Sequence, residues 1–239
     1  MGRVSRRQAL AGFGSVSLAA LLAACSDDDG SAGDATSART ATQESDPAPS
    51  SAGDLASRFD DAAHCRRTAE ETAGPFYFEV DRVRSDIREG HDGAPLRLGV
   101  RVRDLAQGCD PIPNAVVDVW HCDATGSYSE PGETYLRGLQ VTNRDGIAEF
   151  TTIYPGWYPG RTVHIHAKVH LDKRTVLTTQ FYFDDDFTDR VFSLEPYASD
   201  TGRDAFNDSD PLYERDLELS LSKEGDAYLG LITLDVAAA

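Results

Sequence analysis

The sequence predicts an all-β fold, an antiparallel β-sandwich with long loops, and three observations lead to it. Apolar and polar residues alternate in several short runs, which is the pattern of half-buried strands. Turn-forming clusters such as 108–111 and 143–146 separate these runs, and few segments carry a helical period. The part of the chain from 59 to 239, about 180 residues, has the size of one domain.

Each expected strand is an alternating or apolar run that is bounded by turn residues. The runs are Leu96–Asp104, Ala115–His121, Ile147–Thr152, Val163–Leu171, Thr175–Phe183, Leu217–Leu221 and Tyr228–Val236. Between 184 and 211 the chain is rich in Asp and Gly, and we expect long loops there. The triplet Asp184–Asp186 fits either a calcium loop or, more simply, a solvated turn.

The N-terminus has the pattern of an export signal. Arg6 and Arg7 precede the apolar run 9–24, which is shorter than the roughly 20 residues of a membrane-spanning helix, and they fit a twin-arginine signal. The run ends at a lipobox whose Cys25 would carry the lipid, although a plain cleaved signal has the same outline. We therefore expect a signal over 1–25, a disordered Ser-, Asp- and Gly-rich linker over 26–58, and an exported, extracellular or cell-surface lipoprotein whose only membrane contact is the lipid.

Charge and cysteines limit the partners and the covalent structure. The formal net charge of −17 argues against nucleic acid, because phosphate contacts need a basic patch. With Cys25 assigned to the lipobox, three cysteines remain for an oxidising compartment. We favour a disulfide between Cys65 and Cys109 with Cys122 as a buried thiol, but three cysteines allow three pairings.

The run 163–171 carries the chemistry. Its apolar residues face one way, and His164 and His166 face the other, about 6–7 Å apart along a strand, so both can bind one metal ion. His170 lies about 13 Å from His166 along the same strand and cannot complete that site. Two imidazoles suit zinc, copper, iron or nickel, whereas the simpler alternative is a pair of polar residues facing solvent.

Two tyrosines favour one of these metals. Tyr158 precedes the first histidine by six residues on a Pro- and Gly-rich turn, and Tyr128 follows the strand expected at 115–121. A phenol with a pKa near 10 stays deprotonated at neutral pH only on a strongly Lewis acidic cation. A set of two tyrosines and two histidines therefore indicates Fe(III).

The chain from about 71 to 183 resembles the intradiol ring-cleavage dioxygenases, which include protocatechuate, catechol and hydroxyquinol dioxygenases. The resemblance lies in the segments Glu71–Tyr77, Pro113–Trp120, Asp123–Tyr128, Tyr154–Pro159, His164–His166 and Gln180–Phe183. It implies that Tyr128, Tyr158, His164 and His166 bind a non-haem ferric ion, that Arg161 and Gln180 lie beside the bound catechol, and that Tyr158 leaves the metal to accept a substrate proton. Ala73 replaces the family's usual Glu, and His121-Cys122 replaces a Gln-Ala type pair, as in its secreted single-chain branch.

The resemblance also implies the reaction and its partners. A catechol-type aromatic diol and dioxygen would give a muconate-type diacid by cleavage between the hydroxyls. Phe76, Tyr77 and Trp157 could form an apolar slot for the ring, or belong to the core, Phe76 above all. Because Arg161 is the one cation the sequence offers to a ring carboxylate, we expect broad use of neutral catechols. The alternative function is a non-catalytic transthyretin-like β-sandwich module for adhesion or carbohydrate binding, and the oligomeric state, a homodimer included, stays open.

Overall fold

The computed structural model describes residues 55–59 and 65–238. The expected signal, its Cys25 and nearly all of the expected linker lie outside these residues. Within the described part, no helix is long and apolar enough to cross a membrane.

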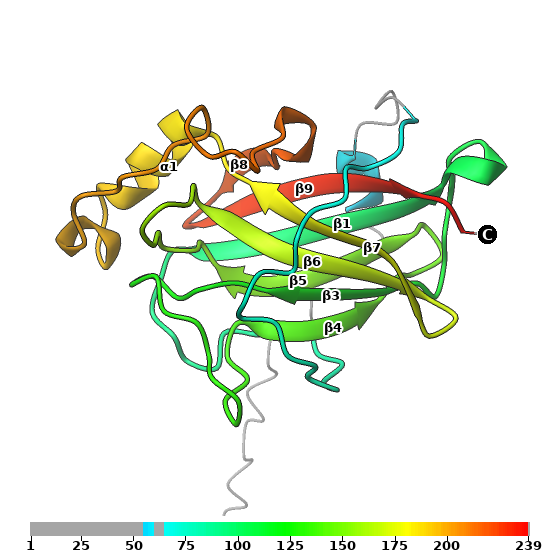
Figure 1. The fold of residues 1–239 in the computed structure, drawn as a ribbon, viewed down its shortest axis with the longest axis horizontal. Coiled ribbons are helices and arrows are strands. Elements are labelled where there is room, and N and C mark those ends of the chain that lie inside the picture. The colour runs from blue at the N-terminus through cyan, green and yellow to red at the C-terminus, as the bar shows by residue number, and fades with distance from the viewer. Residues whose placement is uncertain (1–54, 60–64, 239) are drawn as a thin grey trace, which may run out of the picture. The chain divides into compact units, whose positions relative to one another are not determined.

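The described domain is a sandwich of two β-sheets, as the sequence predicts (Figure 1). One sheet has the order β2-β1-β9-β8, with β5 also paired to β1, and the other has the order β4-β3-β6-β7. The strands are β1 Pro95–Asp104, β2 Asp110–Pro111, β3 Val116–Trp120, β4 Arg137–Val141, β5 Ile147–Ile153, β6 His164–Leu171, β7 Arg174–Tyr182, β8 Ser220–Glu224 and β9 Ala227–Val236. Short 3-10 turns lie at Ala56–Arg58 (η1), Leu105–Gln107 (η2), Tyr197–Ser199 (η3) and Arg215–Leu217 (η4).

Alternation along the strands builds the core between the sheets. In β6, Ile165, Ala167 and Val169 are fully buried and belong to the main apolar cluster, together with Val100 of β1 and Leu234 of β9. The alternate residues of β6 therefore stand on the outer face of the β4-β3-β6-β7 sheet. This geometry places the two histidines of β6 on one face.

Several features differ from the expectation. Strands β2 and β4 were not expected, and β8 lies at Ser220–Glu224 instead of Leu217–Leu221 because Leu217 ends the 3-10 turn η4. The sandwich is not wholly antiparallel, because β1 and β9 pair in parallel over nine residue pairs, Leu96–Tyr228 to Asp104–Val236. Helix α1, Asp185–Phe192, occupies part of the region expected to be loop. The expected calcium loop or turn at Asp184 is instead the start of this helix, since the Asp184 carboxylate accepts a hydrogen bond from the amide of Phe187 and two further carboxylates lie in the first turn.

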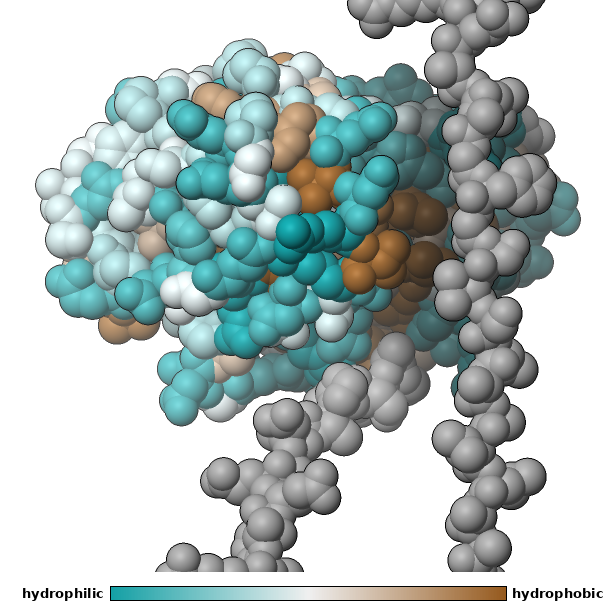
Figure 2. Space-filling view, turned by 90° about the horizontal axis from the view of Figure 1, so that it is seen from below, coloured by the Kyte–Doolittle hydropathy of each residue, from teal (hydrophilic) through white to brown (hydrophobic). Residues whose placement is uncertain are grey.

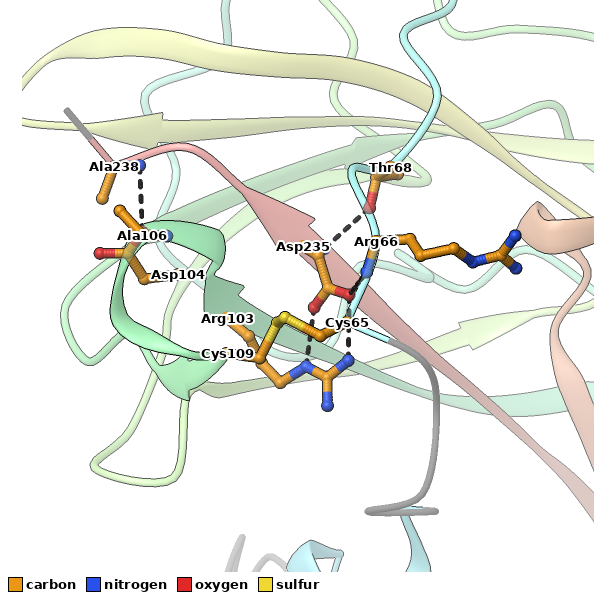
Figure 3. The surroundings of a disulfide bond; sticks show 9 residues. All are labelled: Cys65, Arg66, Thr68, Arg103, Asp104, Ala106, Cys109, Asp235 and Ala238. Carbon is orange, nitrogen blue, oxygen red and sulfur yellow. Dashed lines mark hydrogen bonds and ion pairs between the residues drawn. A yellow bond between two sulfur atoms is a disulfide. The ribbon is translucent and has the colours of Figure 1, made fainter.

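The segment 65–78, here called the strap, crosses the outer face of the β4-β3-β6-β7 sheet (Figure 1). Its first residue forms the disulfide Cys65–Cys109, the pairing favoured from the sequence (Figure 3). Hydrogen bonds then fix the strap to β9 through Thr68 and Asp235, and to β7 through the amide of Glu71 and the carbonyl of Thr178. The strap thereby reaches the end of the sheet where His164 and His166 lie.

The surface is in keeping with the acidic composition. The face in Figure 2 is mostly hydrophilic, with hydrophobic residues gathered in one area. Among the described residues, large exposed apolar side chains are Phe76, Val83, Val141, Leu194 and Phe206.

Candidate metal centre

The structure brings the four predicted ligand residues together. The Nε2 atoms of His164 and His166 lie 3.1 Å apart, and the Tyr158 hydroxyl lies 3.0 Å from Nε2 of His164. The Tyr128 ring centroid is 5.7 Å from that of Tyr158 and 6.1 Å from that of His166. Tyr158 comes from the turn before β6 and Tyr128 from the loop between β3 and β4, so three segments converge on one point. His170, as expected, takes no part and contacts Thr175 instead.

Hydrogen bonding fixes the tautomer of His164. Its Nδ1 lies 2.7 Å from the carbonyl oxygen of Thr162, and because a carbonyl only accepts, Nδ1 must carry the proton. The Nε2 lone pair is therefore directed into the cluster. Burial, and then the charge of Arg161, lowers the pKa of His164 to about 3, so the ring is neutral at pH 7. Burial also lowers the pKa of His166 well below its usual value. Both imidazoles are in the form that binds metals.

Both phenols need a cation nearby to ionise. Burial raises the pKa of Tyr128 well above its ordinary value and raises that of Tyr158 as well. The Tyr128 hydroxyl is buried and has no hydrogen-bond partner among the described residues. A buried polar atom without a partner costs about 1–3 kcal/mol, so a ligand for this oxygen would remove a real penalty. Two neutral imidazoles and two phenol oxygens are a donor set for a hard, strongly Lewis acidic ion.

The walls of the cluster hold His166 in place. The Trp120 ring stacks on His166 with centroids 5.0 Å apart and planes 3° apart. On another side lies Gly74 of the strap, whose φ is +66° and where a Cβ atom would come within 3.2 Å of Cε1 of His166. Glycine is thus required both by the backbone conformation and by the close approach.

Arg161 and Gln180 lie together beside the cluster, as predicted. Arg161 donates from Nη2 to Oε1 of Gln180 at 2.6 Å and from Nε to Asp210 at 2.8 Å. Gln180 is fully buried and donates from Nε2 to the carbonyl of Thr72 at 3.1 Å, so its amide joins the arginine to the strap. The Asp210 hydrogen bond and charge raise the pKa of Arg161 even though burial opposes this.

Asp210 is the residue of this network that sequence reasoning missed. Its side chain is completely buried and also accepts from the amides of Thr162 at 3.0 Å and Leu212 at 2.9 Å. Burial raises the pKa of Asp210, but these amides and Arg161 outweigh it, and the pKa lies below its usual value. The carboxylate therefore stays charged and pins the guanidinium. In the sequence it is one of several aspartates between 184 and 211, and nothing there sets it apart.

The three aromatic residues expected at a substrate slot take different places. Phe76 is 42% exposed rather than part of the core, and it stacks on Tyr128 at 4.4 Å with its edge toward Tyr158 at 6.2 Å. Tyr77 contacts Trp120 with ring centroids 4.7 Å apart and planes tilted by 53°. Trp157 packs against the core and donates from its indole to the carbonyl of Asp200. Of the three, Phe76 is the one in ring contact with the predicted ligands.

The pair His121-Cys122, which departs from the family pattern, is buried. His121 is 1% exposed and its Nε2 lies 2.7 Å from the hydroxyl of Thr152, and burial lowers its pKa to about 4. Cys122 is a buried free thiol whose Sγ lies 3.5 Å from the carbonyl of Gly156. The hydrogen bonds of both side chains go to residues other than the four predicted ligands.

Comparisons with known proteins show the family to which the chain belongs. Residues 73–200 match the model of a family described as Dioxygenase. A chlorocatechol 1,2-dioxygenase of Rhodococcus opacus is 30% identical over 149 residues, covering 50% of this chain and 57% of its own length. The beta chain of a protocatechuate 3,4-dioxygenase of Burkholderia cepacia is 32% identical over 151 residues, covering 54% of this chain and 62% of its own. The chain thus spans little more than half the length of these curated relatives.

A solved structure extends the match to the fold. An intradiol ring-cleavage dioxygenase from Tetranychus urticae superposes with a TM-score of 0.67 at 29% identity, covering 73% of this chain and 96% of its own. The matched family model spans just over half of the chain and includes all four predicted ligands, Arg161 and Gln180. The chain therefore belongs to the intradiol ring-cleavage dioxygenase family.

Proposed function

We propose that the chain is a non-haem Fe(III) dioxygenase that cleaves catechol-type aromatic rings between the two hydroxyls to muconate-type diacids. The observation that carries the proposal is the meeting of the two imidazole Nε2 atoms, 3.1 Å apart, with the Tyr158 hydroxyl and the unpartnered hydroxyl of Tyr128. Tyr128, Tyr158, His164 and His166 would hold the ion. When bound, ferric iron would supply the Lewis acidity that keeps phenol and diol oxygens deprotonated and activates the ring toward dioxygen.

Tyr158 has the role of a proton acceptor for the diol. It stands on a turn rather than on a strand, and its isolated backbone bridge is to Arg161, three residues on. Its hydroxyl can therefore turn away from the cluster and take a substrate proton on Oη. Tyr128, which stacks on Phe76, keeps its place.

Arg161 has the role of a fixed cation. Asp210 and Gln180 hold its guanidinium from two directions, so no reorganisation is needed when negative charge develops on the substrate. Since Gln180 spends Oε1 on Arg161 and Nε2 on the strap carbonyl of Thr72, its role is to orient Arg161.

The charges around the cluster favour neutral substrates. The Arg161 charge is already balanced by the buried carboxylate of Asp210, and the net charge of the chain is −17. A ring carboxylate would therefore gain little from Arg161 and would be repelled at long range by the net negative charge. We propose broad use of catechols, with catechol or hydroxyquinol handled at least as well as protocatechuate. Oxygen uptake on a panel of ring-substituted catechols tests this, and a strict preference for protocatechuate refutes it.

The decisive test of the activity is metal content together with the visible spectrum, before and after addition of catechol. A ferric tyrosinate centre gives a red-brown protein with close to one iron per chain and a band that changes when catechol binds. A colourless protein without iron after loading with ferric or ferrous salts would refute the proposal. That result would favour a non-catalytic β-sandwich module.

We also propose that the enzyme acts outside the cytoplasm. The proposal is supported by the twin-arginine pattern at Arg6 and Arg7 and by the lipobox at Cys25. Replacing both arginines by lysine should stop export, and replacing Cys25 by serine should release the protein from the membrane fraction. A mature N-terminus elsewhere than at residue 25, determined by mass spectrometry, would contradict lipidation.

A further inference from the structure

One arginine beside the predicted metal centre is buried without a carboxylate in salt-bridge contact among the described residues, although the charge of Asp118 acts on it. Arg137, the first residue of β4, is 2% exposed. Its Nε donates to Oγ of Ser129 at 2.5 Å, and its Nη2 donates to the carbonyls of Phe76 at 2.7 Å and Ser129 at 3.1 Å. Among the residues that the structure describes, it forms no salt bridge, and its Nη1 has no hydrogen-bond partner. Burial lowers the pKa of Arg137 from its ordinary value.

A buried charge of this kind is costly unless its contacts do something that an apolar side chain cannot. Replacing buried ionic groups by apolar ones of similar volume is often neutral or stabilising. The guanidinium lies over the face of Phe78, with Cζ 3.9 Å from the ring centroid, and this cation–π contact offsets only part of the cost, about 0.5–2 kcal/mol. The further contribution of the guanidinium lies in the acceptors that it joins.

Those acceptors lie on the two segments that form the Tyr128 stack. Ser129 directly follows Tyr128, and Phe76 is the ring that lies on Tyr128 at 4.4 Å with planes 11° apart. The planar guanidinium holds the backbone of both partners at once. On its own strand pair, Arg137 is opposite Trp120, the ring that stacks on His166. Arg137 thus contacts the segments that position Tyr128 and is paired with the residue that stacks on His166.

We infer that Arg137 is the positioning residue for Tyr128, acting by clamping the strap onto the loop that carries this tyrosine. The inference rests on the proposed function, in which Tyr128 is a metal ligand. The clamp depends on the arrangement of donors in a plane and not on charge alone. Lysine keeps the charge and has donors for the two carbonyls, but it lacks the second nitrogen that donates to Oγ of Ser129 and the rigid plane that fixes all three bonds together, so it should hold the two segments less firmly.

The test compares Arg137→Lys and Arg137→Met with the wild-type protein. The measurements are iron affinity by competition with a chelator and the position of the tyrosinate-to-iron absorption band. We expect both variants to bind iron about 10- to 100-fold more weakly, as is usual when an outer partner of a metal ligand is lost, and to show a shifted band. Arg103→Lys is the matched control, because Arg103 is also buried but its guanidinium bonds to Asp235, which is not one of the four predicted ligands (Figure 3). It should lose stability while keeping iron affinity and band.

A second variant pair tests the route of the effect. Phe76→Leu removes the stack directly, so the double change Phe76→Leu with Arg137→Lys should be little worse than Arg137→Lys alone. Additive losses, or wild-type affinity and band in Arg137→Lys, overturn the inference and leave the proposed function intact. A wild-type protein that takes up no iron refutes both.

Discussion

Replacing Asp210 by asparagine tests how much of the reaction depends on a fixed Arg161. The substitution keeps the size of the side chain and removes its charge. Both carboxylate oxygens are used: Oδ2 accepts from Arg161 and from the amide of Thr162, and Oδ1 accepts from the amide of Leu212. An asparagine amide has one oxygen, so either orientation sets an NH2 group against a donor.

The better orientation keeps the oxygen toward Arg161 and leaves the amide of Leu212 unpaired. Breaking a fully buried ion pair costs about 3–5 kcal/mol, but the Arg161 side chain is 18% exposed, so we expect a cost at or somewhat below the lower end of this range. A loss of about 2–3 kcal/mol in a domain of this size lowers Tm by roughly 5–10 °C. Misplacing a catalytic group by about 1 Å costs up to 100-fold in rate, so kcat should fall about 10- to 100-fold.

The assay is steady-state oxygen uptake with catechol, alongside iron content and thermal unfolding. Iron content should stay near that of the wild type, because Asp210 contacts none of the four predicted ligands. The loss should fall on kcat rather than on KM, since Arg161 acts on charge that develops during the reaction. Asp235→Asn is the matched control: its carboxylate also accepts from an arginine Nε, at 2.7 Å, and from a backbone amide, at 3.0 Å. If both variants lost stability and rate alike, the effect would be general destabilisation and the reasoning about Arg161 would be refuted.

Three further predictions follow from the site and its surroundings. Tyr128→Phe should remove most of the visible band and impair iron retention, whereas Tyr158→Phe should keep iron and slow the reaction; wild-type colour and rate in both would show that the ligand assignment is wrong. His164→Ala and His166→Ala should each leave little bound iron in a folded protein, measured by metal analysis and circular dichroism, and full iron occupancy in both would contradict the site. Burial raises the pKa of Asp118 to about 7, above its usual 3.8, so the folded state binds the extra proton and stability falls as pH rises from about 4 to 7. Asp118→Asn should flatten that part of the pH dependence of unfolding, and an unchanged slope would show that Asp118 does not cause it.

The strands were predictable because alternation is a local property of the sequence. The run from Val163 to Leu171 determines both its core face and the face of its histidines, and β6 follows it almost residue for residue. Strand β4 was missed because Arg137 and Gly138 break the apolar pattern, and α1 because three aspartates at its start suggest a loop. These aspartates stabilise the helix because their carboxylates lie near the free amides of its first turn. That stabilisation depends on their position at the helix start, which composition alone does not reveal.

The supporting residues of the site could not be predicted in the same way. Tyr128 and the β6 histidines are recognisable by their chemical type and their neighbours in sequence. Asp210 and Arg137 act through contacts with segments that are distant along the chain, 49 residues away for Asp210 with Arg161 and 61 for Arg137 with Phe76. Asp210 lies in a segment with many aspartates, and Arg137 lies in a strand of mixed polar and apolar residues, so neither is distinguished by its neighbours in sequence.

The parallel pairing of β1 with β9 has a consequence for how the domain is made. Strand β9 lies between β1 and β8 in the sheet. Its contacts with β1 connect parts of the chain that are distant in sequence; Arg103 and Asp235, for example, are 132 positions apart. Contacts so remote in sequence must close a long loop before they contribute any stability, which slows folding. During synthesis, the edge of β1 that pairs with β9 therefore stays unpaired from the time β1 emerges until β9, about 130 residues later, has emerged as well. An unpaired strand edge is a site for wrong pairing, so this is the interval in which a chaperone that recognises extended chain would have most to bind.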